Sequence, residues 1–409
     1  MTARSVPPLC ILGGQIAALA LARRVGRLGA GVMIADTDPG AIAFASRFCR
    51  HRVALRSAEP ETWLEPLLAA GRTWAGAGGP VLLATSDEWL AWMSRWREQL
   101  SAVFCLRLPP AELLQVLMDK RRMTALAAAH GVAVPRHVTI TGAAELVAAA
   151  RQMGFPCLLK SAVSHPAGRA AEAGKIRVRD AAELTDAYRR LAALDPRLSV
   201  QEYLPGGCER VALYNAYFAP PAGTPLAVFT GRKLQQYPVA YGTACLSECR
   251  PMPGLAPPLT AFFQAIGYTG PVDVGSKWDA RDGQFKLLDI NPRLGQNYAG
   301  FVAAEGQDAG DDLGWLAYAD AAGLLPQERY GRCVGPGRPG RWVIEDDFLR
   351  AWRRRGSLAA DGAGRPAALG AGLRARRFAF WSWRDPAPWL HRMARAWRQR
   401  RPRGTARVR

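Results

Sequence analysis

Residues 271–295 read PVDVGSKWDARDGQFKLLDINPRLG, and this stretch decides the fold class. It predicts two short strands joined by a turn at Asp282-Gly283, a dipeptide typical of hairpins. Side chains alternate between the faces of a strand, so Asp289 and Asn291 point the same way, and Asp273 can face the same space from the neighbouring strand. Two carboxylates and a carboxamide on one face form an all-oxygen cluster, which suits Mg²⁺ held between protein and phosphate oxygens.

Arg293 follows two positions after Asn291. Its planar guanidinium could bind two oxygens of a phosphate or an acyl phosphate. A surface hairpin with ordinary solvated acids is the alternative reading of this stretch.

Lysine usage gives an independent indication of a binding site. The chain has 54 lysines and arginines, of which six are lysines: Lys120, Lys160, Lys175, Lys233, Lys277 and Lys286. In a chain so rich in arginine, a lysine indicates a position that needs a compact ammonium group. Lys160 ends the apolar run GFPCLLK, a predicted buried strand, whereas Lys120 precedes a helical pattern. A solvated surface position is the alternative for both lysines.

Residues 199–210, SVQEYLPGGCER, predict a strand that runs into a Pro-Gly-Gly turn between Glu202 and Glu209. The backbone of such a turn can pair with the edge of an adenine, and a carboxylate can accept from ribose hydroxyls. Turns of this composition are common, so this motif is weak by itself.

In chain order these motifs resemble the ATP-grasp superfamily, and within it the carboxylate–amine ligases similar to D-aspartate ligase. D-alanine–D-alanine ligase, biotin carboxylase and carbamoyl-phosphate synthase belong to the same superfamily. The resemblance covers approximately residues 110–325, with one further phrase before them. It rests on ATSDE at 84–88, MDK at 118–120, GRK at 231–233 and KLLDINPR at 286–293.

The resemblance implies a role for each motif. Lys120 and Lys160 would hold the α- and β-phosphates of ATP, with Lys175 also in the nucleotide site. Glu202, Tyr203 and Leu204 would form the adenine-binding connector, and Glu209 would bind the ribose.

The resemblance also implies that Asp273 and Asp289 bridge the metal, Mg²⁺ or Mn²⁺, with Asn291 as a further ligand. Arg293 would lie near the transferred phosphate. Two departures matter: the second metal acid is Asp where Glu is commoner, and a longer loop before Gly283 makes Asp279 a rival of Asp273 as first ligand.

The predicted strand at 229–238 places Arg232 and Lys233 on opposite faces, and we expect Lys233 to face the catalytic site. Residues 161–174 are small and predict a loop that closes over the triphosphate. A plain hairpin loop is the alternative, with His165 as a surface residue.

The predicted architecture is α/β. The length predicts two or three domains. The resemblance implies a Rossmann-like preATP-grasp domain over residues 1–112 and a two-lobed α+β ATP-grasp domain over 113–325, followed by an arginine-rich extension over 326–409. Residues 9–36 predict a strand, a Gly-Gly turn, a helix and a strand that ends at Asp36. Without a full GxGxxG motif, a dinucleotide-binding dehydrogenase is the weaker interpretation. Residues 81–89 predict another strand, followed by a helix whose N-cap is Ser86 or Asp87. Both residues are candidates for the substrate site.

Composition narrows the class of protein. Hydrophobic residues make up 49% of the sequence, which indicates a globular chain, and no apolar run is long enough to span a membrane. The eight cysteines are scattered singly, which argues for a reducing cytoplasm and against structural zinc.

The C-terminal part differs in charge. Residues 341–409 hold 18 arginines and five acids, which gives +13 of the formal net charge of +20. A predicted helix places Trp389, Leu390, Met393 and Trp397 on one side among arginines. Peripheral contact with an anionic membrane, contact with nucleic acid and a helix docked on its own fold are the three interpretations.

The function predicted from these motifs is ATP-dependent ligation of a carboxylate to an amine through an acyl phosphate. One alternative is another ATP-grasp chemistry such as carboxylation, against which the absence of a MetLysMet biotin-attachment phrase counts. The other is a non-catalytic nucleotide-binding scaffold that the basic tail holds at a membrane or nucleic acid.

Overall fold

The computed structural model describes residues 6–74, 79–161, 175–193, 198–220, 224–238, 241–301, 312–335, 340–354, 372 and 375–400. The chain divides into two compact units. The first unit comprises Met1–Arg107, Leu294–Leu325 and Phe378–Arg409, and the second comprises Leu108–Arg293 and Pro326–Arg377.

This division differs from the predicted one at 112 and 325. Leu294–Leu325 belongs to the first unit because α12 (Leu313–Ala321) packs against α1 (Ile16–Gly26), and Arg24 forms an ion pair with Asp312. Residues 326–409 form no separate extension, since they contribute to both units.

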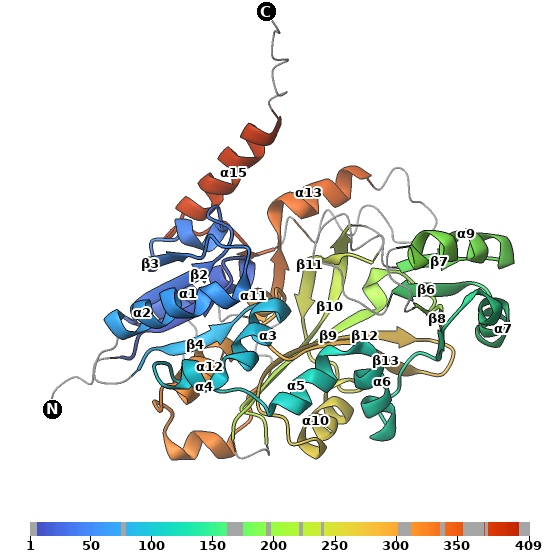
Figure 1. Ribbon diagram of the computed structural model, residues 1–409, viewed down its shortest axis with the longest axis horizontal. Helices are drawn as coiled ribbons and strands as arrows, with labels where there is room; N and C mark the ends of the chain where they lie inside the picture. Colours follow the sequence, from blue (N-terminus) through green and yellow to red (C-terminus); the bar gives the residue numbers. More distant parts are fainter. Residues whose placement is uncertain are drawn as a thin grey trace, which may run out of the picture. The chain divides into compact units, whose positions relative to one another are not determined.

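The first unit is built on a parallel sheet in the order β3-β2-β1-β4. Its strands are β1 (Leu9–Leu12), β2 (Val32–Asp36), β3 (Cys49–Ala54) and β4 (Val81–Ala84). β1, β2 and β4 are buried along their whole length, which explains their continuous apolar sequences. The predicted strand–helix–strand unit over residues 9–36 is confirmed (Figure 1).

Helices complete this unit. They are η1 (Ile42–Ala45), η2 (Pro60–Trp63), α2 (Leu64–Trp74), α3 (Asp87–Arg95), α4 (Arg97–Ser101), α11 (Tyr298–Phe301) and α15 (Ala387–Arg400), besides α1 and α12. α3 begins where the sequence predicts, because the Ser86 hydroxyl accepts the Trp89 N–H at 3.3 Å.

The second unit contains a seven-stranded sheet in the order β13-β12-β9-β10-β11-β14-β15. The strands are β9 (Val211–Phe218), β10 (Ala227–Tyr237), β11 (Thr243–Cys249), β12 (Gly270–Asp279), β13 (Gln284–Asn291), β14 (Gly340–Val343) and β15 (Arg377–Phe378). Short helices η3 (Cys208–Arg210) and η4 (Gln327–Gly331) and the helix α13 (Glu345–Arg354) belong to the same unit.

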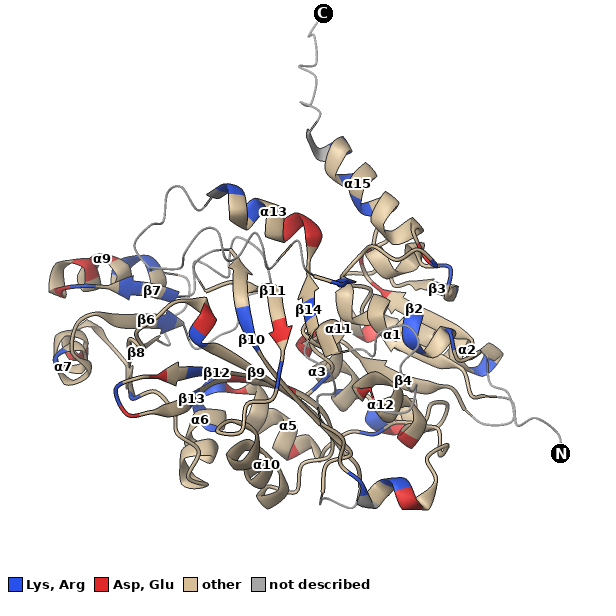
Figure 2. Cartoon of the chain, turned by 180° about the vertical axis from the view of Figure 1, so that it is seen from behind, with Lys and Arg blue, Asp and Glu red and all other residues tan. Residues whose placement is uncertain are grey.

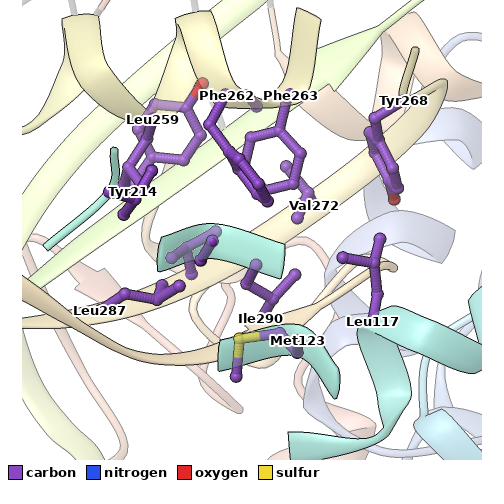
Figure 3. Packing of buried hydrophobic residues seen from close by; sticks show 14 of the residues in the cluster. Leu117, Met123, Tyr214, Leu259, Phe262, Phe263, Tyr268, Val272, Leu287 and Ile290 are labelled. Carbon is purple, nitrogen blue, oxygen red and sulfur yellow. The ribbon is translucent and has the colours of Figure 1, made fainter. Parts of the chain in front are cut away.

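One face of this sheet is covered by α5 (Ala111–Met118), α6 (Lys120–Ala129) and α10 (Ala256–Ala265). Figure 3 shows Phe262 and Phe263 of α10 pointing toward Val272 and Ile290 of the sheet. This apolar core leaves the opposite face for polar side chains.

A smaller antiparallel sheet of the second unit has the order β5-β8-β6-β7. Its strands are β5 (His137–Ile140), β6 (Cys157–Ser161), β7 (Lys175–Val178) and β8 (Leu198–Glu202). α7 (Ala143–Met153) and α9 (Ala181–Ala192) cover one face with an apolar core (Figure 1). Lys160 and Lys175 are register partners on the other face.

The predicted hairpin is confirmed as β12 and β13. Gly283 closes the turn with φ +69°, and its N–H bonds to the Asp279 carbonyl at 2.9 Å. A β-bulge interrupts the register between Gly275 and Ser276, where Asp289 pairs with Gly275 and Leu287 pairs with Ser276. The extra residue therefore lies in β13.

Candidate active site

The hairpin brings the predicted acids together on the face opposite the core. Asp273 lies across from Asn291, and Asp289 lies across from Gly275, two positions along. The amide of Asn291 donates to the Asp273 carbonyl at 3.2 Å. Asp273 is buried, and the Asn215 amide of β9 donates to its carboxylate at 3.1 Å. These contacts fix the orientation of Asp273 toward the shared face.

Lys160 and Lys175 bring positive charge to the same place. Burial, followed by the charges of Lys175 and Lys120, lowers the pKa of Lys160 to about 7, while Asp289 acts in the opposite direction. Burial and the charge of Lys120 lower the pKa of Lys175 to about 8, again against Asp289. The Lys160 ammonium also donates to Gln201 at 2.7 Å. Side chains of the small sheet therefore converge on an acid of the large sheet.

Lys233 joins this group from β10. Burial lowers its pKa, whereas Asp273 and Asp289 raise it, and its ammonium donates to the Gly242 carbonyl at 2.9 Å. Arg232 instead forms an ion pair with Glu248 at 3.1 Å. Lys233 therefore lies near the two acids, and its role at the catalytic site stays a prediction.

The resulting group is the lysine cluster, defined as Lys120, Lys160, Lys175 and Lys233. Figure 2 shows basic segments on β6, β7 and β10, which carry the last three. Lys120 begins α6, which Asp119 caps through bonds to two backbone N–H groups. Like charges at this density are unfavourable unless a polyanion lies among them, which makes the cluster a candidate phosphate site.

Arg293 lies beside the acids. Its guanidinium donates to the Asn291 side-chain oxygen at 3.3 Å, and its backbone N–H bonds to the Asn291 carbonyl. Arg293 therefore bonds to the same side-chain oxygen that the sequence assigns as a metal ligand.

Glu202 ends β8 and is buried at 2% exposure. Its carboxylate accepts from the Arg136 backbone N–H at 2.9 Å and pairs with Lys286 at 3.2 Å and Arg281 at 2.9 Å. Burial alone would raise its pKa, but these bonds lower it. The Glu202 carboxylate is therefore bound by two cations of the β12–β13 hairpin.

A second contact ties the following residues to the same hairpin. The Lys277 ammonium donates to the carbonyls of Leu204 and Gly206 at 2.8 and 2.6 Å, and it lies 5.4 Å from the Tyr203 ring. We call Lys277, Arg281 and Lys286 the latch. The sequence prediction does not assign any of them to the site, although the rarity of lysine could have indicated two.

Asp279, the rival first ligand, pairs with two residues of the latch. It forms ion pairs with Arg281 at 2.6 Å and Lys286 at 2.9 Å, and the bonds from Arg281 hold its pKa well below the ordinary value. The hairpin register places it six residues along β12 from Asp273. Glu209 is exposed on η3, where its carboxylate accepts the Gly207 N–H at 3.1 Å.

The Gly13-Gly14 turn of the first unit is occupied by side chains of neighbouring residues. The Asp36 carboxylate accepts the backbone N–H groups of Gly14 and Asp38, and burial raises its pKa. A Cβ at Gly14 would lie 2.5 Å from the Ala41 side chain. The glycine thus serves close packing, which argues against a dinucleotide cradle.

Residues 162–174, with His165, lie outside the described residues, so the predicted closing loop stays a prediction. In the described part of the chain, no group of three or more His, Cys, Asp and Glu side chains forms a metal site. The Asp273, Asp289 and Asn291 set offers two carboxylates and one amide oxygen. Such donors fit Mg²⁺ or Mn²⁺ when phosphate oxygens complete the coordination.

The chain is similar in sequence to curated ligases. It is 28% identical over 199 residues to a D-alanine–D-alanine ligase of Stutzerimonas stutzeri, which covers 48% of this chain and 62% of the relative. A D-alanine–D-alanine ligase of Pseudomonas fluorescens is 26% identical over 205 residues, 49% of this chain and 61% of that enzyme. The chain thus spans less than two thirds of the length of these relatives. No family model matches the sequence.

Solved structures share the fold over a longer stretch. An N5-carboxyaminoimidazole ribonucleotide synthetase in complex with ADP has a TM-score of 0.65 at 14% identity, covering 91% of this chain and 97% of that one. An L-amino acid ligase of Bacillus licheniformis has a TM-score of 0.61 at 14% identity, with 83% and 80% covered. A biotin carboxylase of Campylobacter jejuni has a TM-score of 0.57 at 17% identity, with 80% and 74% covered.

The chain therefore shares its fold with these solved structures, and over about half of its length it is similar in sequence to ligases. All of these proteins belong to the ATP-grasp superfamily. This confirms the resemblance found in the motifs at the superfamily level. The closer similarity to D-aspartate ligases stays a prediction.

Proposed function

We propose that this protein is an ATP-dependent ligase that joins a carboxylate to an amine. The single observation that carries the proposal is the convergence of the lysine cluster on Asp273 and Asp289. Four ammonium groups with two nearby acids form a site for a highly charged anion, and the triphosphate of ATP has the matching charge.

The reaction has two steps. The substrate carboxylate attacks the γ-phosphorus of ATP, and ADP leaves, which gives an acyl phosphate. The amine then attacks the acyl carbon, phosphate leaves, the nitrogen loses a proton, and an amide remains. Both steps need positioning and charge neutralisation more than proton chemistry, so no dedicated histidine base is required.

Each group of site residues would have its own role in the reaction. Lys120, Lys160 and Lys175 would neutralise the α- and β-phosphates, and Lys233 would lie nearer the transferred phosphate. Asp273, Asp289 and Asn291 would hold Mg²⁺, which supplies charge neutralisation between phosphate groups when bound. Arg293, held by Asn291, would stabilise the oxyanion that develops at the acyl carbon.

The connector would hold the base. In this proposal the backbone of Glu202–Leu204 pairs with the adenine edge, and exposed Glu209 binds the ribose. Because Lys277 already uses the Leu204 carbonyl, the base would pair with the remaining backbone groups. The chemistry requires ATP, and the cysteines of the described residues are free, so we propose the cytoplasm as its location.

Measurement of ADP release tests the proposal. The purified protein is incubated with ATP and Mg²⁺ and with amino acids singly and in pairs, and amide products are sought by mass spectrometry. We expect ADP release that depends on a carboxylate and an amine together. Release with bicarbonate alone would establish carboxylation instead. ATP binding without release under any acid–amine pair would establish a scaffold.

A further inference from the structure

The C-terminal segment is anchored to the first unit by a buried carboxylate. Asp385 is completely buried and accepts from the Arg23 guanidinium at 2.9 Å, the Ser46 hydroxyl at 2.7 Å and the Arg47 N–H at 2.9 Å. Farther along, His391 lies 3.3 Å from the Gly40 carbonyl, and Arg395 pairs with Asp38 at 3.1 Å. One face of α15 is therefore docked.

The same segment also presents large apolar groups to solvent. Trp383 is 84% exposed, Leu390 56% and Trp397 59%. Leu390, Ala394 and Trp397 follow the three- and four-residue spacing of one helix face, and Ala394 is exposed as well. Exposed apolar side chains gathered over one short segment are typical of an interaction surface.

After Asp385, the charged residues of the segment itself are all of one sign. Residues 386–409 contain eight arginines and no acid. Figure 2 shows basic segments and no acidic segment along α15. Arg384 and Arg398 are exposed beside the apolar groups. A partner must therefore accept tryptophan and leucine side chains and also carry negative charge.

We propose that Trp383, Leu390 and Trp397 form a docking surface for an anionic lipid bilayer, bound peripherally. Tryptophan prefers the boundary between headgroups and acyl chains, and arginine pairs with lipid phosphates. A nucleic acid would satisfy the arginines but not Leu390, which favours lipid. No helix among the described residues is long and apolar enough to cross a membrane, and surface binding does not require one.

Vesicle co-sedimentation tests this surface independently of ligase activity. The full chain is mixed with vesicles of phosphatidylcholine alone or of equal parts phosphatidylglycerol and phosphatidylcholine, at about 0.05 M and about 0.5 M salt. We expect binding to the anionic vesicles that weakens at high salt. The triple variant Trp383→Ser, Leu390→Ser, Trp397→Ser should bind at least about tenfold more weakly.

The matched control is Leu349→Ser with Trp352→Ser, which removes two exposed apolar side chains of α13, 49% and 45% exposed. This control should bind vesicles like the wild type, and both variants should keep the wild-type melting temperature.

Wild-type protein that ignores anionic vesicles at low salt would overturn the proposal. Unchanged binding by the triple variant would do so too. A wild-type dimer that becomes a monomer in the triple variant would show that a second copy covers the surface. Tighter binding to a DNA duplex than to vesicles, unaffected by the triple variant, would assign the arginines to nucleic acid.

Discussion

At the scale of single residues, the two candidate metal acids of β12 differ in their surroundings. Asp273 faces Asn291 and Asn215, whereas Asp279 is neutralised by Arg281 and Lys286. A carboxylate already paired with two cations has little affinity left for a divalent ion. The structure thus supplies a reason to prefer Asp273 that the sequence does not contain.

We expect Asp289→Asn and Asp273→Asn each to lower Mg²⁺-dependent ADP release by at least about a hundredfold, or about 3 kcal/mol of barrier, because each removes a charge that would hold the metal. Steady-state rates across a Mg²⁺ titration measure this. Asp279→Asn serves as the control and should leave the Mg²⁺ dependence unchanged. A hundredfold loss in Asp279→Asn with normal activity in Asp273→Asn would reverse the assignment.

The lysine cluster predicts a linkage between nucleotide and protons. In the free protein the pKa of Lys160 is about 7 and that of Lys175 about 8, both below their ordinary value of 10.5. Between pH 7 and pH 10.5 these lysines hold more protons in the unfolded chain than in the folded chain. Their contribution to the free energy of unfolding therefore rises with pH above about 7. A triphosphate bound among these lysines would raise both pKa values again, because a nearby negative charge favours the charged form of a lysine.

ATP binding at pH 8 should therefore take up more than one proton, about 0.9 at Lys160 and about 0.5 at Lys175, and affinity should fall as pH rises from about 7 to about 10. Calorimetry in buffers of different ionisation enthalpy measures the uptake. The Lys160→Gln variant should take up fewer protons on ATP binding than the wild type. The control is Arg179→Gln, which breaks an exposed ion pair with Glu183 in the same unit and should take up as many protons as the wild type. Binding enthalpies that do not depend on the buffer would contradict the placement of the triphosphate among these lysines.

At the scale of elements, the β12–β13 hairpin could be predicted and its second role could not. Alternating polarity and the Asp-Gly turn predict two strands with Asp273, Asp289 and Asn291 on one face. Strict alternation places Lys286 and Asp289, three residues apart, on opposite faces. The bulge in β13 reverses the phase, so both point away from the core.

The sequence also could not predict that Lys286 pairs with Glu202. Glu202 lies 84 residues away in sequence, and no local pattern specifies which acid meets which lysine. The N-terminal βαβ unit, by contrast, was predictable because its strands are continuously apolar and its helix is amphipathic.

The latch predicts a separation between nucleotide binding and chemistry. Lys277→Met removes the bonds to the Leu204 and Gly206 carbonyls, so the connector is held less firmly. We expect the KM for ATP to rise about tenfold while kcat changes less than about threefold, since Lys277 acts through the connector and not on the transferred phosphate. Lys277→Arg should recover part of the affinity. An equal fall in kcat, or an unchanged KM, would remove Lys277 from this positioning role.

At the scale of the whole molecule, residues 375–400, a described stretch of the basic C-terminal region, are part of the fold. The sequence alone left three interpretations open, because it shows the arginines and tryptophans but not what Asp385 contacts. The buried carboxylate pairs with Arg23, and the same guanidinium donates to the Phe380 and Asp385 carbonyls at 2.7 and 2.9 Å. The docked-helix interpretation therefore holds for one face of α15, while the exposed face is open to a further role.

Asp385→Ala should destabilise the first unit strongly, since it leaves the buried Arg23 guanidinium without its counter-charge. Loss of one partner from a buried pair costs about 3–5 kcal/mol, which corresponds to a fall of several degrees in melting temperature. The control is Glu61→Gln, which breaks the exposed pair with Arg95 and should leave the melting temperature close to that of the wild type. Calorimetric melting of both variants makes the comparison. Similar small shifts in the two would mean that the C-terminal segment detaches readily and that Asp385 does not anchor it.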